Sequence, residues 1–167
     1  MTQTLKDKLA GKTILVVDDQ PYTVRDYLYR FRDAGVAYEN VETMDTAFER
    51  LKQNPDRYGI ALLDLNMPEA TTPALLAHDP ALGLKPTSFN HGRRLGLYLW
   101  AQREALKLPY CYLSALSHVY GQTLGEFAGQ ESDFILDKAA VLASELQDRL
   151  VQVLDKWAML PAPGAQS

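Results

Sequence analysis

Short apolar runs alternate along the chain with longer amphipathic stretches. The first run, residues 13–17 (Thr-Ile-Leu-Val-Val), is apolar at nearly every position, which is typical of a strand buried on both faces. Four further runs of the same kind follow it and predict four more strands. These runs cover residues 36–43, 58–63, 109–113 and 134–136.

The stretches between these runs carry apolar residues at helical spacing. In the first stretch Val24, Leu28 and Phe31 share one face, Pro21 suits the first turn, and Gly35 suits the C-terminal end. The stretch at 117–128 predicts a weaker helix, because each of its recurrent glycines costs about 1 kcal/mol relative to alanine. Four of the predicted helices cover residues 22–34, 93–106, 117–128 and 139–157. A further short helix lies between the first two, capped by Asp45 or Thr46 and ended by Asn54-Pro55. In the last helix the buried side carries Leu142, Leu146 and Leu150.

Strands that alternate with helices predict an α/β domain with a parallel sheet covered on both faces. A chain of 167 residues, 47% of them hydrophobic, suits one such domain with a substantial core and no disulfide or metal staples. We expect a doubly wound, five-stranded domain at 13–157, an extension at 1–12 and a disordered tail at 158–167. Ligands in such sheets bind at the carboxyl ends of the strands.

Composition and charge exclude several classes of protein. The net charge of −4 argues weakly against a nucleic-acid-binding chain. The single cysteine, Cys111, excludes an internal disulfide and a cysteine-rich zinc site, and its place within a strand predicts a buried thiol. The sequence has no run of 18 apolar residues, so no membrane span is predicted, and residues 1–12 lack the apolar core of a signal peptide. We therefore expect a reduced, cytoplasmic setting.

Polar residues follow the predicted strands at the end where ligands bind. Asp18 and Asp19 follow the first strand, Asp64 the third, Ser114 the fourth, and Lys138 comes after the fifth. Three converging carboxylates repel one another, and Mg²⁺ would remove that repulsion while keeping positions open for water and a phosphate. A lysine and a hydroxyl would hold the other phosphoryl oxygens. Because an aspartate can itself be the nucleophile, the pattern favours phosphoryl transfer onto a carboxylate.

Four segments follow one another along the chain: ILVVDD at 14–19, LDLNMP at 63–68, YLSA at 112–115 and FILDK at 134–138. Together they resemble the receiver domain of bacterial two-component response regulators. Each segment is a weak signal alone, but the four occur in order, near the family spacing, and each at a strand end. The resemblance implies a flavodoxin-like sheet with strand order 2-1-3-4-5.

The resemblance also implies a metal site. Asp64 would be the phosphoacceptor and a Mg²⁺ ligand. Asp19 would bind the ion directly and Asp18 mainly through water. The backbone carbonyl of Asn66 would supply a further ligand.

Two more residues would contact the phosphoryl group, and two depart from the family pattern. Lys138 would pair with the phosphoryl oxygens, and Ser114 would hydrogen-bond the phosphoryl group and couple its presence to helix movement. Ile135 stands where the family usually has a switch Tyr or Phe, and Ala139 replaces the proline that commonly follows the lysine. These changes affect the expected route of switching and leave the phosphorylation site intact.

An insertion at 69–91 lengthens the segment after Asp64 beyond the family's usual span. Thr72-Pro73 and Asp79-Pro80 each resemble an N-cap followed by a first-turn proline, which predicts two short helical turns. The insertion would be either a lid or partner-docking surface beside the site, or a loop that only covers local core. In the first case three basic residues would lie near the phosphate entrance: His91, Arg93 and Arg94.

The resemblance implies a stand-alone switch rather than an enzyme. It would receive a phosphoryl group from a histidine kinase or histidine phosphotransfer protein with Mg²⁺, and would signal by contact with a downstream protein. A homodimer is left open, and neither nucleic acid nor a membrane is expected as a partner. The alternative is a phosphorylation-independent binding module on the same fold. A phosphohydrolase of the haloacid-dehalogenase type is disfavoured, because its acid–base aspartate would fall on Gln20 or Pro21.

Overall fold

A computed structural model describes residues 2–80, 91–115, 126–127 and 130–162. Its five strands form one parallel sheet in the order β2-β1-β3-β4-β5, which confirms the predicted α/β class and strand order. The strands are β1 (Thr13–Val17), β2 (Tyr38–Val41), β3 (Tyr58–Leu63), β4 (Tyr110–Ser114) and β5 (Ile135–Asp137).

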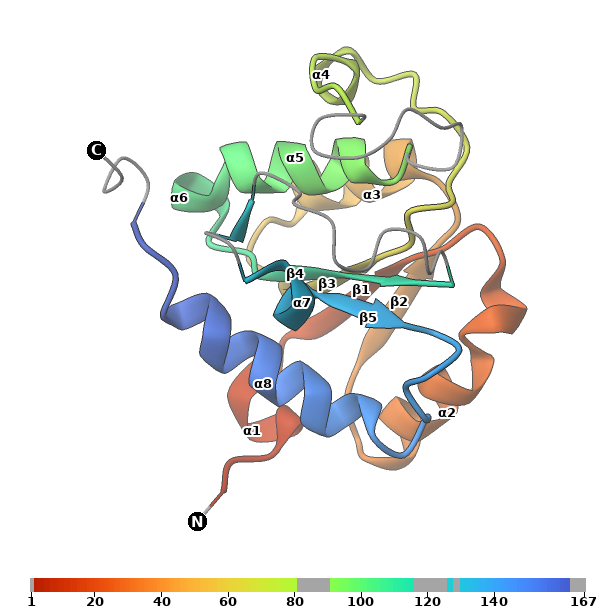
Figure 1. The fold of residues 1–167 in the computed structure, drawn as a ribbon, viewed down its shortest axis with the longest axis vertical. Helices are drawn as coiled ribbons and strands as arrows, with labels where there is room; N and C mark the ends of the chain where they lie inside the picture. Colours follow the sequence, from red (N-terminus) through yellow and green to blue (C-terminus); the bar gives the residue numbers. More distant parts are fainter. Residues whose placement is uncertain (1, 81–90, 116–125, 128–129, 163–167) are drawn as a thin grey trace.

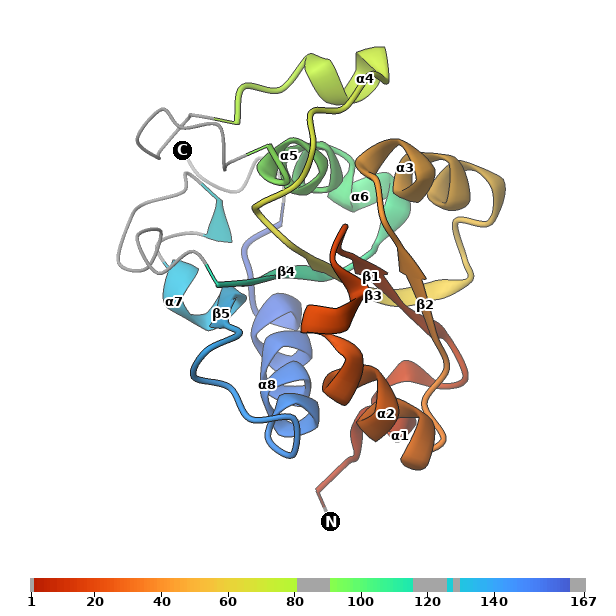
Figure 2. The same ribbon diagram turned by 90° about the vertical axis from the view of Figure 1, so that its right-hand side faces the viewer.

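Helices cover both faces of this sheet (Figure 1 and Figure 2). One layer contains α3 (Met44–Gln53), α5 (Arg93–Ala101) and α6 (Arg103–Leu106), with the short α4 (Pro73–Leu76) beyond them. The other layer contains α1 (Leu5–Leu9), α2 (Arg25–Asp33) and α8 (Leu146–Ala158). A 3-10 turn, η1 (Pro21–Thr23), precedes α2, and α7 (Glu131–Phe134) leads directly into β5.

The central strands are buried because both layers pack on them. Every residue of β1 is buried, and in β3 only Gly59 is partly exposed. Their uninterrupted apolar runs therefore match a strand with no solvent-facing side, and the predicted bounds of both strands are confirmed. Cys111 in β4 is buried, as predicted, and burial raises the pKa of its thiol to about 12.

The last helix begins at Leu146, so the predicted start at residue 139 is wrong. A turn precedes it, in which the side chain of Asp137 accepts from the amide of Ala139 and its carbonyl accepts from Val141. Leu142, predicted on the buried face, is 61% exposed, and its amide donates to the side chain of Glu145. The helical spacing of the leucines therefore extends through a turn that is not helical.

Other predicted helices differ at their ends. The helix expected from residue 22 is divided into η1 and α2, and the helix expected at 93–106 is divided at Gln102 into α5 and α6. Thr43, rather than Asp45 or Thr46, caps α3 by accepting from the amide of Thr46. Most of the helix predicted at 117–128 lies outside the described residues, and Phe127 at its end has a left-handed backbone with φ 61°.

The first twelve residues contain a helix that the apolar pattern did not reveal. Leu5 and Leu9, four residues apart on α1, are both buried, and Thr4 and Asp7 form a reciprocal capping box. The ammonium of Lys8 lies 2.5 Å from a carboxylate oxygen of Asp155 on α8. Residues 2–12 are thus packed against the domain.

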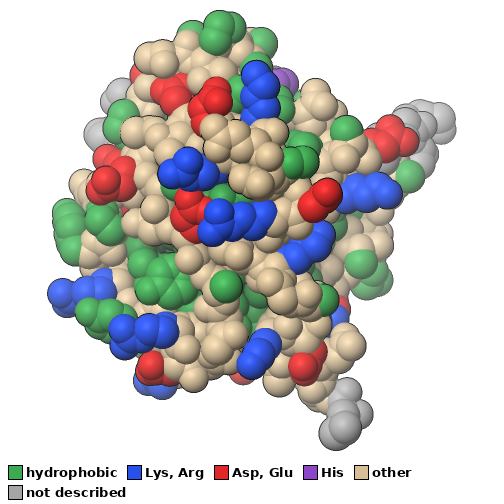
Figure 3. All heavy atoms as spheres, turned by 180° about the vertical axis from the view of Figure 1, so that it is seen from behind, with side chains coloured by type: hydrophobic (Ala, Val, Ile, Leu, Met, Phe, Trp, Pro, Cys, Tyr) green, Lys and Arg blue, Asp and Glu red, His purple; other side chains and the backbone are tan. Residues whose placement is uncertain are grey.

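Charged side chains on the surface are mixed in sign. Figure 3 shows Lys and Arg side chains interspersed with Asp and Glu over one face of the molecule. Within the part of the chain that the structure describes, no helix is long and apolar enough to cross a membrane.

Candidate functional site

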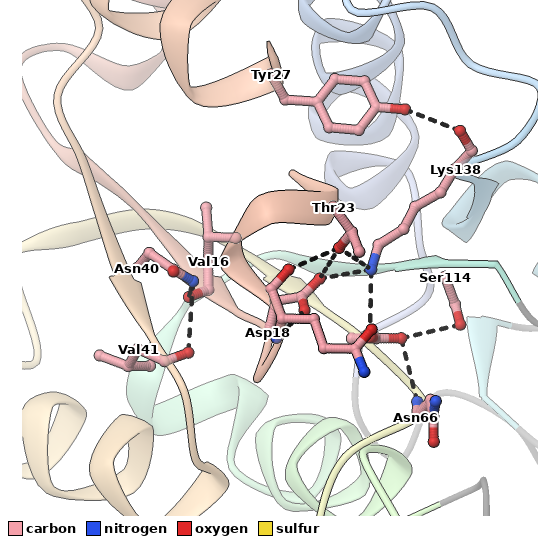
Figure 4. Close-up of polar contacts among 11 residues, drawn as sticks. Val16, Asp18, Thr23, Tyr27, Asn40, Val41, Asn66, Ser114 and Lys138 are labelled. Carbon is pink, nitrogen blue, oxygen red and sulfur yellow. Dashed lines mark hydrogen bonds and ion pairs between the residues drawn. The ribbon is translucent and has the colours of Figure 1, made fainter. Parts of the chain in front are cut away.

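A pocket of about 290 Å³ opens at the carboxyl ends of the strands. It lies where chain segments leave β1, β3, β4 and β5, the edge of a parallel sheet at which ligands bind. Figure 4 shows the polar side chains that meet there. The lining residues are Gln20, Thr23, Asp64, Asn66, Ser114, Ala115, Lys138 and Ala139.

Three carboxylates meet at this edge. Asp18, Asp19 and Asp64 each offer an oxygen, and these oxygens all lie within 4.8 Å of one another. Asp18 and Asp64 are buried, and the Oδ1 atom of Asp19 is buried without a hydrogen-bond partner among the described residues. A cation at this edge would offset the repulsion between these like charges.

Lys138 supplies one positive charge to the cluster. Its Nζ lies 2.5 Å from Oδ2 of Asp18 and 3.2 Å from Oδ2 of Asp64, and it also donates to Thr23 Oγ1 at 3.2 Å (Figure 4). The hydroxyl of Tyr27 lies 2.6 Å from the backbone carbonyl oxygen of Val141 and 3.2 Å from that of Lys138, so α2 contacts the loop that carries the lysine. The lysine therefore bridges two of the three carboxylates.

The carboxylate of Asp64 is oriented by three donors. Ser114 Oγ donates to its Oδ1 at 3.0 Å, the backbone amide of Asn66 donates to the same oxygen at 3.1 Å, and Lys138 contacts Oδ2. Ser114 is fully buried at the end of β4, which borders β3 and so places the hydroxyl beside Asp64. The donors hold the carboxylate in one orientation at the pocket.

Burial and hydrogen bonding act in opposite directions on Asp18. Burial raises the pKa of its carboxyl above the ordinary value, and Lys138 and the backbone amide of Gln20 offset part of that rise. One lysine thus compensates incompletely for the desolvation of this carboxylate.

Gly92 brings α5 against the site. Its amide donates to the carbonyl of Leu65, one residue after Asp64, at 3.0 Å. A methyl group at Gly92 would overlap the carbonyl oxygen of Asp64. Only a glycine therefore allows α5 to begin this close to the Asp64 backbone.

Solved structures that align with this chain include receiver domains. The response regulator TrrA from Thermotoga maritima, in complex with Mg(2+)-BeF, aligns at 18% identity and a TM-score of 0.55, over 85% of this chain and 98% of that one. A response regulator receiver protein from Burkholderia phymatum aligns at 17% identity and a TM-score of 0.55, over 91% of this chain and 98% of that one. A CheY-like receiver domain from Methanospirillum hungatei aligns at 14% identity and a TM-score of 0.56, over 89% of this chain and 98% of that one. This chain has the receiver-domain fold. No family model matches the sequence, and no curated protein does.

In this receiver fold the acidic cluster suits Mg²⁺. The ion takes oxygen ligands, usually from one or two carboxylates, and retains several waters. The unpartnered buried oxygen of Asp19 is the observation that favours an ion, because a buried carboxylate oxygen without a partner is costly. Asp18, Asp19, Asp64 and the backbone carbonyl of Asn66 are the residues that would hold it.

The beginning of the insertion is tied to the receiver fold. We call residues 69–78 the insertion stem. The carboxylate of Asp45 in α3 accepts from the amide and hydroxyl of Thr71 and of Thr72, at distances from 2.5 to 3.2 Å. Thr72 and Pro73 begin α4, so the first of the two predicted helical turns is confirmed, while most of the second lies outside the described residues.

Replacing Asp45 with alanine is expected to lower the free energy of unfolding by about 1–2 kcal/mol at pH 7, because two backbone amides lose their acceptor. Burial alone would raise the pKa of Asp45, but the hydrogen bonds from Thr72 and Thr71 lower it below its ordinary value of 3.8. The ionised form is thus the stabilised one, and its contribution is lost as the pH falls through the lowered pKa. Denaturant unfolding at pH 7 and at pH 3 should show the difference between wild type and variant shrinking in acid. A difference that grows in acid would contradict this.

The three basic residues predicted near a phosphate entrance have other partners. Arg93 is fully buried and pairs with Glu126, so its predicted place at the entrance is wrong. Arg94 donates to Glu69 Oε1 at 2.7 Å, and His91 Nδ1 lies 3.0 Å from Glu69 Oε2. Arg94 therefore ties the insertion stem to the start of α5, and neither Arg94 nor His91 is among the described residues that line the pocket.

Proposed function

We propose that this chain is a receiver that accepts a phosphoryl group on Asp64 from a histidine kinase or a histidine phosphotransfer protein, in the presence of Mg²⁺. The observation that carries the proposal is the placement of a buried, oriented Asp64 carboxylate at a pocket beside Lys138 and Ser114. The acidic cluster around it and the receiver fold support the same function. The product would act by contact with a downstream protein.

In the proposed reaction a carboxylate oxygen of Asp64 attacks phosphorus and forms an O–P bond. The P–N bond of the phosphohistidine donor breaks, and its electron pair returns to the imidazole nitrogen. Lys138 and Ser114, which contact the two oxygens of Asp64, would donate to the transferred phosphoryl oxygens. Bound Mg²⁺ would supply positive charge against the phosphoryl oxygens.

The test is to incubate the full chain with Mg²⁺ and acetyl phosphate and to record its intact mass. Wild type is expected to gain one phosphoryl group, and Asp64→Asn is expected to gain none. Asp56→Asn, which removes an exposed carboxylate away from the pocket, is the matched control and should be phosphorylated like wild type.

A wild-type chain that stays folded but gains no phosphoryl group and binds no Mg²⁺ would overturn the proposal. It would favour the phosphorylation-independent binding module, which the aliphatic Ile135 in β5 also favours. An adduct that persists in Asp64→Asn would show that another residue is the acceptor.

A further inference from the structure

A second polar cluster is buried on the same face of β4, away from the pocket. Arg93 is 0% exposed and Glu126 is 1% exposed, and Nε of Arg93 lies 3.2 Å from Oε1 of Glu126. The hydroxyl of Tyr112 donates to Glu126 Oε1 at 3.3 Å, and the hydroxyl of Tyr110 donates to its other oxygen. Three donors therefore converge on one buried carboxylate.

This pair is costly to bury, which sets it apart from a surface ion pair. Taking two charges out of water carries a large desolvation cost, and their mutual attraction offsets that cost only in good geometry. Two guanidinium nitrogens of Arg93 have no hydrogen-bond partner among the described residues. Burial raises the pKa of Glu126 to about 7 while Arg93 opposes the rise, so the carboxyl is mostly ionised at pH 8.

Two short paths connect this pair to Asp64. Tyr110, Tyr112 and Ser114 occupy alternate positions of β4 and so share one face of the strand, with Glu126 contacted at one end and Asp64 at the other. On α5, Arg93 directly follows the glycine that lies against the Asp64 carbonyl. The buried pair is therefore connected to Asp64 through β4 and through the Gly92–Arg93 peptide bond.

The residue after Glu126 is held in a strained backbone conformation. Phe127 has φ 61°, a left-handed conformation that residues other than glycine rarely adopt. Its ring stacks on Phe134 with centroids 4.3 Å apart and lies edge-on to Trp100 at 5.5 Å. Such strain persists only where the surroundings fix it, and it is concentrated at switch regions and functional sites. We call Trp100, Tyr110, Phe127, Phe134 and Trp157 the aromatic cluster.

The aromatic cluster joins the two helical layers. Trp100 lies on α5 and Trp157 on α8, on opposite sides of the sheet, and their rings are 5.9 Å apart. Ile135 in β5 is aliphatic and cannot report a change by rotating a ring. Aromatic packing in this part of the molecule is concentrated instead around Phe127.

We propose that the Arg93–Glu126 pair couples phosphorylation of Asp64 to the packing of Phe127 against Trp100 and Trp157. The inference rests on the proposed phosphorylation of Asp64. When Ser114 exchanges its bond to Asp64 for one to a phosphoryl oxygen, the end of β4 and the start of α5 adjust together. Glu126 is bonded to both elements, so it shifts with them and changes the strained conformation of Phe127. The two arrangements form a two-state element that phosphorylation biases.

Tryptophan fluorescence reads this coupling directly, because the chain has two tryptophans and both belong to the aromatic cluster. The full chain is titrated at pH 8 with Mg²⁺ and beryllofluoride, a phosphoryl mimic, and the fluorescence spectrum is recorded. Acetyl phosphate and intact mass are used in parallel to measure the covalent adduct. Wild type is expected to show a change in fluorescence that Asp64→Asn lacks.

Glu126→Gln is expected to lose this fluorescence change while still forming the adduct. Because coupling is reciprocal, its affinity for beryllofluoride should also differ from wild type by about fivefold or more. Arg93→Met/Glu126→Gln removes both charges and keeps an acceptor for the tyrosine hydroxyls, so it serves as a second variant should the single one fail to fold. Glu39→Gln changes a partly buried carboxylate of β2 that also accepts from an arginine and a tyrosine, Arg50 and Tyr58, and is expected to respond like wild type.

The outcomes separate this inference from the proposed function. An adduct in wild type without any fluorescence change would overturn the coupling and leave phosphorylation standing. An undiminished fluorescence change in both Glu126 variants would also overturn it. Absence of the adduct in wild type would instead overturn the proposed function on which the coupling rests.

Discussion

Replacing Gly92 with alanine is expected to lower the free energy of unfolding by roughly 3 kcal/mol or more, at or beyond the usual cost of overpacking. The added methyl group would overlap the backbone carbonyl of Asp64 and the Cα of Leu65. No side-chain rotation relieves an overlap with backbone atoms, so α5 or the segment after β3 must move. Movement of the segment after β3 displaces the carboxylate of Asp64, so phosphorylation by acetyl phosphate should be reduced as well.

Denaturant unfolding and intact mass measure the two effects of this substitution. Gly59→Ala is the matched control, because its methyl group would meet mainly the end of the Leu9 side chain and the Cβ of Lys12. It should cost less stability and leave the adduct intact. Equal stability of the two variants, with an adduct in both, would show that Gly92 has more room than the structure indicates.

Replacing Arg93 with methionine is expected to cost about 3–5 kcal/mol at pH 8, the usual result of leaving one partner of a buried ion pair uncompensated. The cost should shrink below about pH 7, because burial raises the pKa of Glu126 to about 7 and a protonated carboxyl needs no cation. In wild type, the raised pKa means that the protonated carboxyl of Glu126 favours the folded state. This contribution to stability is largest at low pH and is lost as the pH rises through about 7. Unfolding curves at pH 5.5 and pH 8 measure the difference.

Two comparisons control for loss of side-chain volume. Arg94→Met removes the neighbouring arginine, which pairs with the half-exposed Glu69 and donates to the backbone carbonyls of Leu76 and His78, and should cost about 1–2 kcal/mol, less than Arg93→Met. Arg93→Met/Glu126→Gln should recover much of the stability lost in Arg93→Met, since no charge is left unpaired. If Arg93→Met and Arg94→Met lose equal amounts of stability, at pH 5.5 and at pH 8 alike, then Arg93 and Glu126 do not form the charged buried pair that we assign.

The sequence predicts the central sheet and the residues at its carboxyl edge well. β1 and β3 are buried on both faces, so their apolar runs have no polar interruption and their bounds can be read directly. Because parallel strands end at one edge, residues that follow different strands, such as Asp18, Asp64 and Lys138, meet without any further information. Their roles in phosphorylation stay predictions until the acceptor is measured.

Elements that depend on side-chain partners far apart in the sequence were harder to predict. Arg93 carries no local sign of burial, because its partner Glu126 lies 33 positions away and neither residue belongs to a motif. Leu142 continues the helical spacing of Leu146 and Leu150, so the pattern predicts too early a start for α8, although a turn intervenes. α1 could have been predicted from the Thr4–Asp7 spacing together with Leu5 and Leu9, a short signal that a search for long periodic stretches does not detect.

The packing of α1 has a consequence for local unfolding. α1 contacts α8, and its Leu9 side chain lies close to Gly59 of β3, so the beginning and the end of the described chain form one structural unit. Segments that are buried together tend to open together. Opening of α1 would expose the side of α8 that it covers, and the amide protons of both helices should then exchange with deuterium as one group, while those of the exposed 3-10 turn exchange independently.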